Sequence, residues 1–285
     1  MSRTEESELL IHADCLTHIY PDGTKGIHCM YLRVYAHEIV CLCGPNGSGK
    51  STLLEHLNGL LLPTDGILKV FGKRIDAQNL RELRKEVGLV FQDAESQLFS
   101  PPIPHDVMFR PLNLGLSREE ARKRALWALE TVGFKEYEKV PHYLSGGEKK
   151  LVAIAGVLAM RPRIIALDEP TADLDSRNSR RIEELVVKAR DELGMSVVVA
   201  HRDGGLIVVL LQRRVDGGDV REVLELGDPR PQRVDLVTLR VELLAELGEV
   251  ALETVRGSLP GRGVGGLDLR GGLPFRSVDD GHDAG

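Results

Sequence analysis

Residues 44–51 have the clearest chemical potential in the sequence. They read Gly44-Pro45-Asn46-Gly47-Ser48-Gly49-Lys50-Ser51 and fit the pattern G-x-x-x-x-G-K-[ST]. A triphosphate needs backbone N–H donors wrapped closely around its oxygens, and side chains at the glycine positions would hold the backbone away. Lys50 can reach the β- and γ-phosphates, and the Ser51 hydroxyl can ligate Mg²⁺. We expect this loop, together with Thr52, to bind a nucleotide.

A second pair of candidate residues ends an apolar stretch. Residues 164–169 read IIALDE and predict a buried strand that ends in Asp168 and Glu169. Asp168 suits the Mg²⁺ shell, and Glu169 suits the general base that polarises the attacking water. Strand ends commonly carry solvated acids, so this string alone is weak. Its combination with the phosphate loop favours the functional interpretation.

The surrounding sequence supplies elements that can hold both motifs. Residues 38–43 (EIVCLC) predict a buried strand leading into the loop, and residues 51–60 predict the helix after it. Ser117, with Glu120 three residues later, predicts a capped helix that Gly133 ends. Helices are also expected at 145–160 and 176–193, and strands at 87–91 and 195–200. This alternation indicates an α/β fold with a mainly parallel sheet.

Two further motifs resemble a known family. Leu144-Ser145-Gly146-Gly147-Glu148 and Asp168-Glu169-Pro170-Thr171-Ala172-Asp173-Leu174-Asp175, together with Gln92 and His201, resemble the ATP-binding subunit of ABC transporters. The resemblance covers residues 11–201, about two-thirds of the chain. It implies a P-loop NTPase (RecA-like) core, a small antiparallel β subdomain near the N-terminus and an α-helical subdomain at about 93–143. Mg²⁺-dependent ATP hydrolysis is the activity that it implies.

The resemblance also implies a dimer. In this family Ser145, Gly146 and Gly147 would bind the γ-phosphate of the ATP held by a partner subunit, because a serine hydroxyl and bare glycine amides at a helix start form an anion site. Two subunits would then enclose two ATP molecules, as a homodimer or a heterodimer. Glu148 replaces the usual glutamine, and an acid near phosphate is unfavourable unless it points away.

Other roles follow only from the same resemblance. Gln92 would join Ser51 and Asp168 around Mg²⁺ and link the site to the membrane partner. His201 would act with Glu169 in catalysis by holding the γ-phosphate and water, and Tyr20 would stack on adenine. Taken singly, these residues would be an ordinary loop amide, a strand-end histidine and a turn tyrosine.

A narrower resemblance follows Gln92. The segments Ser96-Gln97-Leu98-Phe99, Asp106-Val107 and 111–116 (PLNLGL) resemble the energy-coupling factor ATPases of cobalt, nickel and vitamin importers. That subgroup implies a transmembrane coupling subunit, a substrate-binding membrane subunit and a peripheral position on the cytoplasmic face of the cell membrane. The apolar Leu98-Phe99 pair would dock the coupling subunit, although a plain surface loop is the alternative.

Composition excludes several classes of protein. The 37 Lys+Arg and 43 Asp+Glu give a net charge of −6, which argues against a nucleic-acid partner. The apolar run 206–211 is too short for a membrane helix, and the charged N-terminus has no secretory pattern. Four cysteines do not form a disulfide framework in a chain of 285 residues, so we expect a reduced, cytosolic protein.

Composition changes after the predicted ATP-binding domain, residues 9–203. Lysine is absent after Lys188, and the only aromatic residue in 201–285 is Phe275. We expect residues 204–285 to be a divergent tail without the family's terminal strand pair, in which only Val234–Val255 has helical spacing. A diverged tail and a frame-shifted product both fit this text.

The sequence therefore predicts an ATPase subunit that energises import through a membrane transporter. The alternative is a soluble ABC-type ATPase in DNA repair or translation. The chain has one cassette and no coiled-coil heptads, which disfavours that class. A non-hydrolysing cassette is also disfavoured, because Lys50, Asp168, Glu169 and His201 are all present.

Overall fold

Two β-sheets form the framework of the computed structural model, which describes residues 8–99 and 101–202 and the backbone of 222–225 and 237–240. The first sheet is antiparallel, in the order β2 (Lys25–Tyr35), β1 (Leu9–Ile19), β4 (Asp65–Val70), β5 (Lys73–Arg74). The second has the order β10 (Val237–Arg240), β9 (Glu222–Glu225), β3 (Ile39–Cys43), β8 (Ser196–His201), β7 (Ile164–Asp168), β6 (Val87–Val90). Its strands are parallel except β10.

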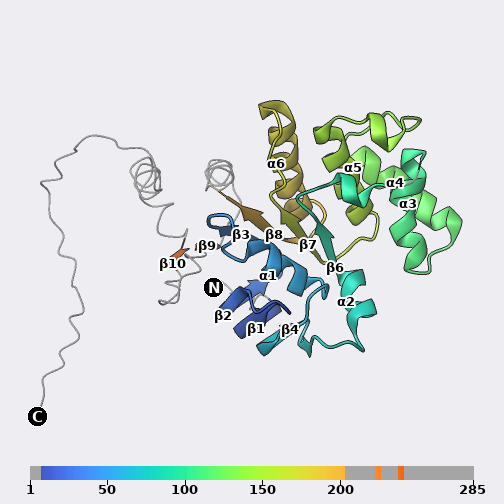
Figure 1. Cartoon of the computed structure of the whole chain (residues 1–285). Coiled ribbons are helices and arrows are strands. Elements are labelled where there is room, and N and C mark those ends of the chain that lie inside the picture. The colour runs from blue at the N-terminus through green and yellow to red at the C-terminus, as the bar shows by residue number, and fades with distance from the viewer. Residues whose placement is uncertain (1–7, 100, 203–221, 226–236, 241–285) are drawn as a thin grey trace, which may run out of the picture.

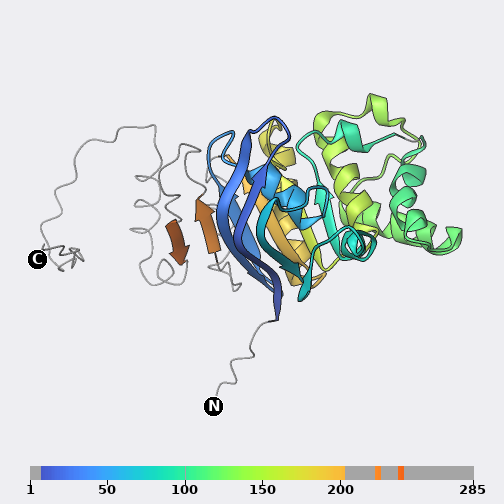
Figure 2. The same ribbon diagram turned by 60° about the horizontal axis from the view of Figure 1, so that its bottom comes forward.

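The unbroken apolar strands reflect burial on both faces of the parallel sheet. In β3, Ile39, Cys41 and Cys43 pack into one core, and Val40 and Leu42 pack into the other. The second of these cores also contains α1 (Lys50–Leu57) and the inner face of the antiparallel sheet. Figure 2 shows α1 lying between the two sheets. Parallel strands covered on both sides read as continuous hydrophobic runs, as observed here.

The other face of the parallel sheet is covered by helices. Figure 1 shows α5 (Gly146–Leu158) and α6 (Ser176–Asp191) beside this face. A helical arm at one end of the molecule contains α3 (Ile103–Asn113) and α4 (Arg118–Thr131), with 3-10 turns η1 (Glu95–Gln97) and η2 (Pro141–Tyr143). The short α2 (Leu80–Glu86) lies beside β6. This arrangement confirms the predicted α/β class with antiparallel and helical subdomains.

Local signals placed the helix ends within a few residues. Ser117 accepts a hydrogen bond from the backbone N–H of Glu120, as expected for the cap of α4. Gly133, which was expected to end this helix, has a φ of 71° two residues beyond its last residue. Left-handed backbone of this kind is typical of helix ends.

The tail corrects one expectation. The structure adds β9 to the free edge of β3 and pairs β10 with β9. An unpaired β3 edge would expose N–H and C=O groups, which a further strand satisfies. Residues 237–240, inside the expected helix Val234–Val255, are therefore a strand. The other tail residues lie outside the described part of the chain.

The cysteines correct a second expectation. Cys15 and Cys29 form a disulfide between β1 and β2, where the antiparallel register is shifted between Ala13 and Leu16. Reduced cysteines were expected from the sequence, because spacing alone does not reveal which residues a hairpin brings together. Cys41 and Cys43 are free and buried, and burial raises the pKa of Cys41. Among the described residues, no helix is both long and apolar enough to cross a bilayer.

Candidate functional site

Nine of the predicted site residues line one pocket of about 340 Å³. Four segments that are distant in sequence meet there: the turn after β1, the phosphate loop with the start of α1, the end of β6 and the end of β7. The lining residues are Tyr20, Thr24, Lys25, Gly26, Asn46, Gly47, Gly49, Lys50, Ser51, Thr52, Gln92 and Glu169. The carboxyl ends of parallel strands are where α/β proteins commonly bind ligands.

The phosphate loop needs its glycines for two different reasons. Gly49 has a φ of 92°, and a Cβ there would lie 2.5 Å from the carbonyl oxygen of Gly26. Gly47 has a φ of 83° with no atom within 4 Å of its Cβ position, so the space before it is open. Gly49 thus allows close packing, while Gly47 leaves room for an anion near the backbone amides.

Lys50 is buried inside this loop. Its Nζ donates hydrogen bonds to the carbonyl oxygens of Gly44 at 2.7 Å and Pro45 at 3.2 Å. It also lies 3.6 Å from Oε1 of Glu169, which is the third group around the ammonium. The cation therefore faces the loop and the strand-end carboxylate at once, where the β- and γ-phosphates are expected.

Asp168 and Ser51 fit a divalent cation. Asp168 is buried, and its Oδ1 has no hydrogen-bond partner. Burial raises the pKa of Asp168, while a hydrogen bond with Ser51 and the charges of Lys50 and Lys150 lower it. A buried carboxylate oxygen without a partner requires an explanation, and a hard cation such as Mg²⁺ prefers oxygen ligands of this type.

Glu169 is held in an unusual backbone conformation. Its φ is 42°, a region that non-glycine residues rarely adopt and that is concentrated at functional sites. Its N–H donates to the carbonyl of Ala200 at 3.0 Å, and its Oε2 accepts from the N–H of Arg202 at 3.1 Å. These bonds aim the carboxylate into the pocket beside Lys50.

Tyr20, which is expected to stack on adenine, is held by contacts with Thr52 and His18. The hydroxyl of Tyr20 lies 2.9 Å from the hydroxyl of Thr52, and its ring meets the His18 ring edge-on at 4.7 Å. A Cβ on Gly26 would lie 2.8 Å from Cε2 of Tyr20. Gly26 therefore permits the ring to lie close to the phosphate loop.

Gln92 and His201 differ in their relation to the pocket. Gln92 lines it, and its backbone carbonyl accepts a hydrogen bond from Lys150. His201, at the end of β8, is not among the lining residues, and its Nε2 lies 2.9 Å from the Thr171 hydroxyl. The structure thus brings His201 to the loop after Glu169, a residue that lines the pocket, but not into the pocket itself.

Ser145, Gly146 and Gly147 also lie apart from the pocket. Ser145 caps α5 and, like Gly146, is exposed, while Gly147 packs against the side chain of Asn178. Exposed helix-start residues outside the pocket agree with a site that serves another subunit. Within this chain they do not complete the nucleotide pocket.

The acid at position 148 has a local role. Oε2 of Glu148 accepts from the N–H of Ser145 at 2.8 Å, completing a capping box, and Oε1 lies 3.1 Å from Nζ of Lys139. Burial would raise the pKa of Glu148, but the hydrogen bonds from Ser145 and Lys139 lower it to about 2. The carboxylate is therefore directed back at the helix start and its charge is compensated.

Known proteins share this sequence and architecture. The profile of the family described as ABC transporter matches residues 27–172. The chain is 45% identical over 227 residues to the energy-coupling factor transporter ATP-binding protein EcfA of Methanocaldococcus jannaschii, covering 78% of this chain and 80% of the relative. It belongs to the ABC transporter family.

Solved structures agree with this assignment. CbiO1 from Clostridium perfringens, described as part of the ABC transporter complex cbiONQ, is similar with a TM-score of 0.72 and 34% identity, covering 89% of this chain and 96% of that one. The dimeric ATP-binding cassette MJ0796, in a post-hydrolysis state bound to ADP and Pi, gives a TM-score of 0.69 at 29% identity, covering 81% and 99%. The chain is accordingly an ABC ATPase, and ATP hydrolysis that energises transport is its activity.

The match to EcfA also corrects the extent of the resemblance. It covers 78% of this chain, and only ten residues precede Ile11. Even if the matched region starts at Met1, it must therefore continue past His201, where the resemblance was expected to end. The pairing of β9 with β3 agrees with this extension.

Sequence reasoning missed three groups at the ATPase site. Gly26 supplies the space between Tyr20 and the loop, and the backbone N–H of Arg202 holds Glu169. Lys150 is buried, although it is a charged residue near the start of a helix. The glycine and the arginine amide carry no sequence signal, and only the apolar run after Lys150 hinted at its burial.

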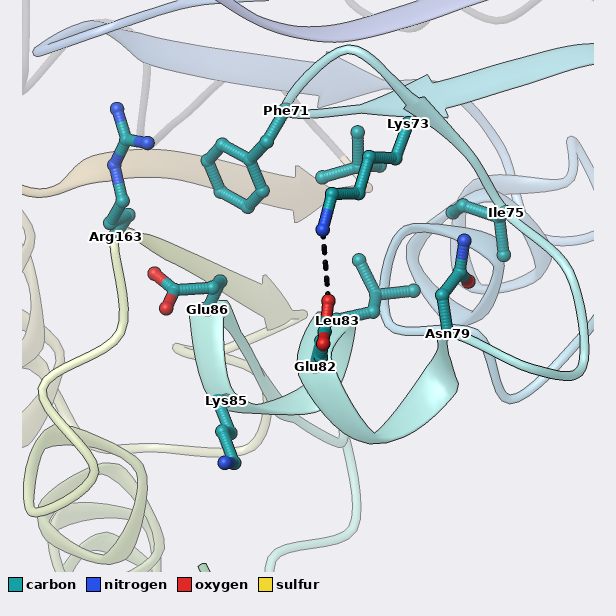
Figure 3. Close-up of a pocket in the computed structure, with 10 residues that line it drawn as sticks. Phe71, Lys73, Ile75, Asn79, Glu82, Leu83, Lys85, Glu86 and Arg163 are labelled. Atoms are coloured by element: carbon teal, nitrogen blue, oxygen red, sulfur yellow. Dashed lines mark hydrogen bonds and ion pairs between the residues drawn. The ribbon is translucent and has the colours of Figure 1, made fainter.

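A second pocket, of about 350 Å³, lies between the β4–β5 hairpin and α2 (Figure 3). Lys73 and Glu82 form an ion pair across it at 2.9 Å, and the Arg163 guanidinium lies 4.7 Å from the Phe71 ring centroid. It contains none of the predicted site residues and no glycine-rich loop. Its chemistry does not suit a triphosphate, so we assign the nucleotide to the first pocket.

Proposed function

We propose that this ABC ATPase is the nucleotide-binding subunit of an energy-coupling factor type importer. The observation that carries the proposal is that the phosphate loop, Ser51 and Glu169 line a single pocket, with Asp168 hydrogen-bonded to Ser51. The identity to EcfA supports the subgroup. The membrane subunits would determine whether the transported substrate is cobalt, nickel or a vitamin.

Each site residue has a separate role in the proposed reaction. Lys50 and the loop amides bind the phosphates, and Tyr20 stacks on the adenine. Ser51, Gln92 and Asp168 would hold Mg²⁺, which when bound neutralises phosphate charge. Glu169 accepts the proton of the attacking water, and His201 orients that water and the γ-phosphate after moving from Thr171.

Closure of two subunits completes each site. Ser145, Gly146 and Gly147 of one subunit contact the γ-phosphate bound by the other, which the exposure of Ser145 and Gly146 outside the pocket supports. The partner is a second copy or a related ATP-binding subunit. ATP binding closes the dimer, and hydrolysis reopens it.

The docking surface for the transmembrane coupling subunit lies on the helical arm. Phe99 and Phe109 are 59% and 42% exposed, and their rings meet edge-on at 4.6 Å. Leu98, expected to be exposed with Phe99, is half-buried and packs on the core. We therefore place the anchor at Phe99 and Phe109, which would hold the subunit at the cytoplasmic face of the membrane.

The double variant Phe99→Ser and Phe109→Ser tests this function. Hydrolysis of Mg-ATP by the isolated subunit should stay near normal, because neither ring lies in the pocket. Apolar anchors contribute about 2 kcal/mol or more at hot spots, so affinity for the coupling subunit should fall at least roughly 30-fold. Tyr31→Ser, at an exposed residue of β2, is the control. Equal co-purification of the double variant and wild type would place the docking site elsewhere.

A further inference from the structure

Lys150 joins three parts of the ATPase that lie far apart in the sequence. It is 4% exposed and belongs to α5, the helix that Ser145 caps. Its Nζ donates to the backbone carbonyl of Gln92, next to β6, and to the backbone carbonyl of Glu169 at 3.3 Å, next to β7. One buried ammonium thus connects the helix that begins within the Leu144–Glu148 sequence (the LSGGE motif) with the segments that carry Gln92 and Glu169.

Acidic side chains surround the Lys150 ammonium. Asp168, Asp93, Asp173 and Glu169 all act on the ammonium through their charges. A buried cation requires compensation by hydrogen bonds and opposite charges, and Lys150 has both. Its neighbour Lys149 instead pairs with Glu95 at 2.8 Å, at the side of the 3-10 turn η1. Only Lys150 of these two reaches the Glu169 backbone.

We propose that Lys150 is a positioning residue that couples the two ATP sites of the dimer. This inference rests on the proposed roles of Glu169, Gln92 and the LSGGE motif. Engagement of Ser145 and Gly146 by the partner's ATP shifts the start of α5. Because Lys150 lies one helical turn after Gly146, the shift moves the carbonyls of Gln92 and Glu169 in the same subunit. The general base then reaches its working position only when the opposite site is filled.

The geometry explains why a backbone contact can control catalysis. Glu169 has a φ of 42°, so its carboxylate direction depends on bonds that hold its peptide groups. The Ala200 carbonyl receives its N–H, and Lys150 binds its carbonyl. A misplacement of about 1 Å at a reacting group can lower a rate by about 10²-fold.

The test compares Lys150→Met, Lys150→Arg and Lys149→Met in the full-length chain. ATP affinity, kcat, KM and the dependence of rate on ATP concentration are measured for each, with thermal melting as a check of folding. Lys150→Met should lower kcat roughly 10- to 100-fold, change ATP affinity by less than about threefold and abolish cooperativity in ATP. Lys150→Arg should restore part of kcat, and Lys149→Met should match wild type.

Other results would overturn the inference. If folded Lys150→Met retains wild-type kcat and cooperativity, Lys150 does not position the site. If ATP affinity, kcat and melting temperature fall together and arginine restores none of them, its role is structural only. A wild-type chain that binds no ATP and hydrolyses none would overturn the proposed function itself, and this inference with it.

Discussion

Nζ of Lys50 lies 3.6 Å from Oε1 of Glu169, and both side chains are buried. The proposed phosphate-binding cation and the proposed general base thus compensate each other's charge across the pocket. With these proposed roles, an arriving γ-phosphate would compete with Glu169 for the ammonium and free the carboxylate to turn to the attacking water. The geometry therefore predicts that phosphate binding and release of Glu169 are linked.

Replacing Lys50 by Ala should weaken ATP binding. Hydrogen bonds to charged groups contribute about 1.5–3 kcal/mol, so the dissociation constant should rise roughly 10- to 100-fold. Isothermal titration with the non-hydrolysed Mg-ATP analogue measures it. Lys73→Ala, at an exposed lysine of the second pocket, is the matched control and should bind normally. Unchanged affinity in Lys50→Ala would contradict the phosphate assignment.

Glu169→Gln should separate binding from hydrolysis. The amide keeps the size and a hydrogen-bond acceptor for the N–H of Arg202 but removes the base, so turnover should fall by about 10²- to 10⁴-fold. Bound ATP should then favour the dimer, which light scattering detects. Glu82→Gln, at an exposed residue of the second pocket, serves as the control. Near-normal turnover in Glu169→Gln would eliminate Glu169 as the base.

Tyr20→Ala should reduce affinity for ATP but not for inorganic triphosphate. Stacking on a base contributes about 1–3 kcal/mol, which corresponds to roughly 5- to 150-fold in binding. Tyr20→Phe keeps the ring and loses only the contact with Thr52, so its effect should be within a few-fold. Competition titrations with ATP and with inorganic triphosphate measure the two affinities. A parallel loss for ATP and triphosphate would argue against stacking.

Glu148 predicts a specific pH dependence of stability. The pKa of its carboxyl lies at about 2 in the folded chain, against an ordinary value of 4.5. A lowered pKa means that the ionised form stabilises the fold, so its contribution is complete above about pH 4.5 and is lost as the pH falls towards 2. Glu148→Gln can keep the capping box without titrating.

Urea unfolding of both proteins between pH 5 and 3 tests this sign. The free energy of unfolding of the wild type should fall relative to Glu148→Gln as the pH decreases. Lys139→Met removes one partner of the carboxylate and should reduce the difference between the two curves. Curves that stay parallel over this range would show that Glu148 is not stabilised as its contacts indicate.

The sequence alone determined the parts of the protein that depend on neighbours within a few residues. The Ser117 cap acts within one turn, so its residue type indicates its role, and the glycine spacing of residues 44–51 predicts a tight loop that agrees with the positive φ of Gly47 and Gly49. The burial of the parallel strands on both faces could also be predicted from the sequence, because a continuous apolar run is typical of a strand that is covered on both sides.

Only the tertiary structure decided contacts between distant segments. Cys41 pairs with Val199, and Lys150 reaches Gln92 and Glu169, 58 positions before it and 19 after it. The disulfide of Cys15 and the edge strand β9 depend likewise on which strands become neighbours. A lysine at the start of a helix reads as a solvated charge in sequence, because its burial is set by elements that local patterns do not specify. Which buried carbonyls face it is therefore a property of the packed fold.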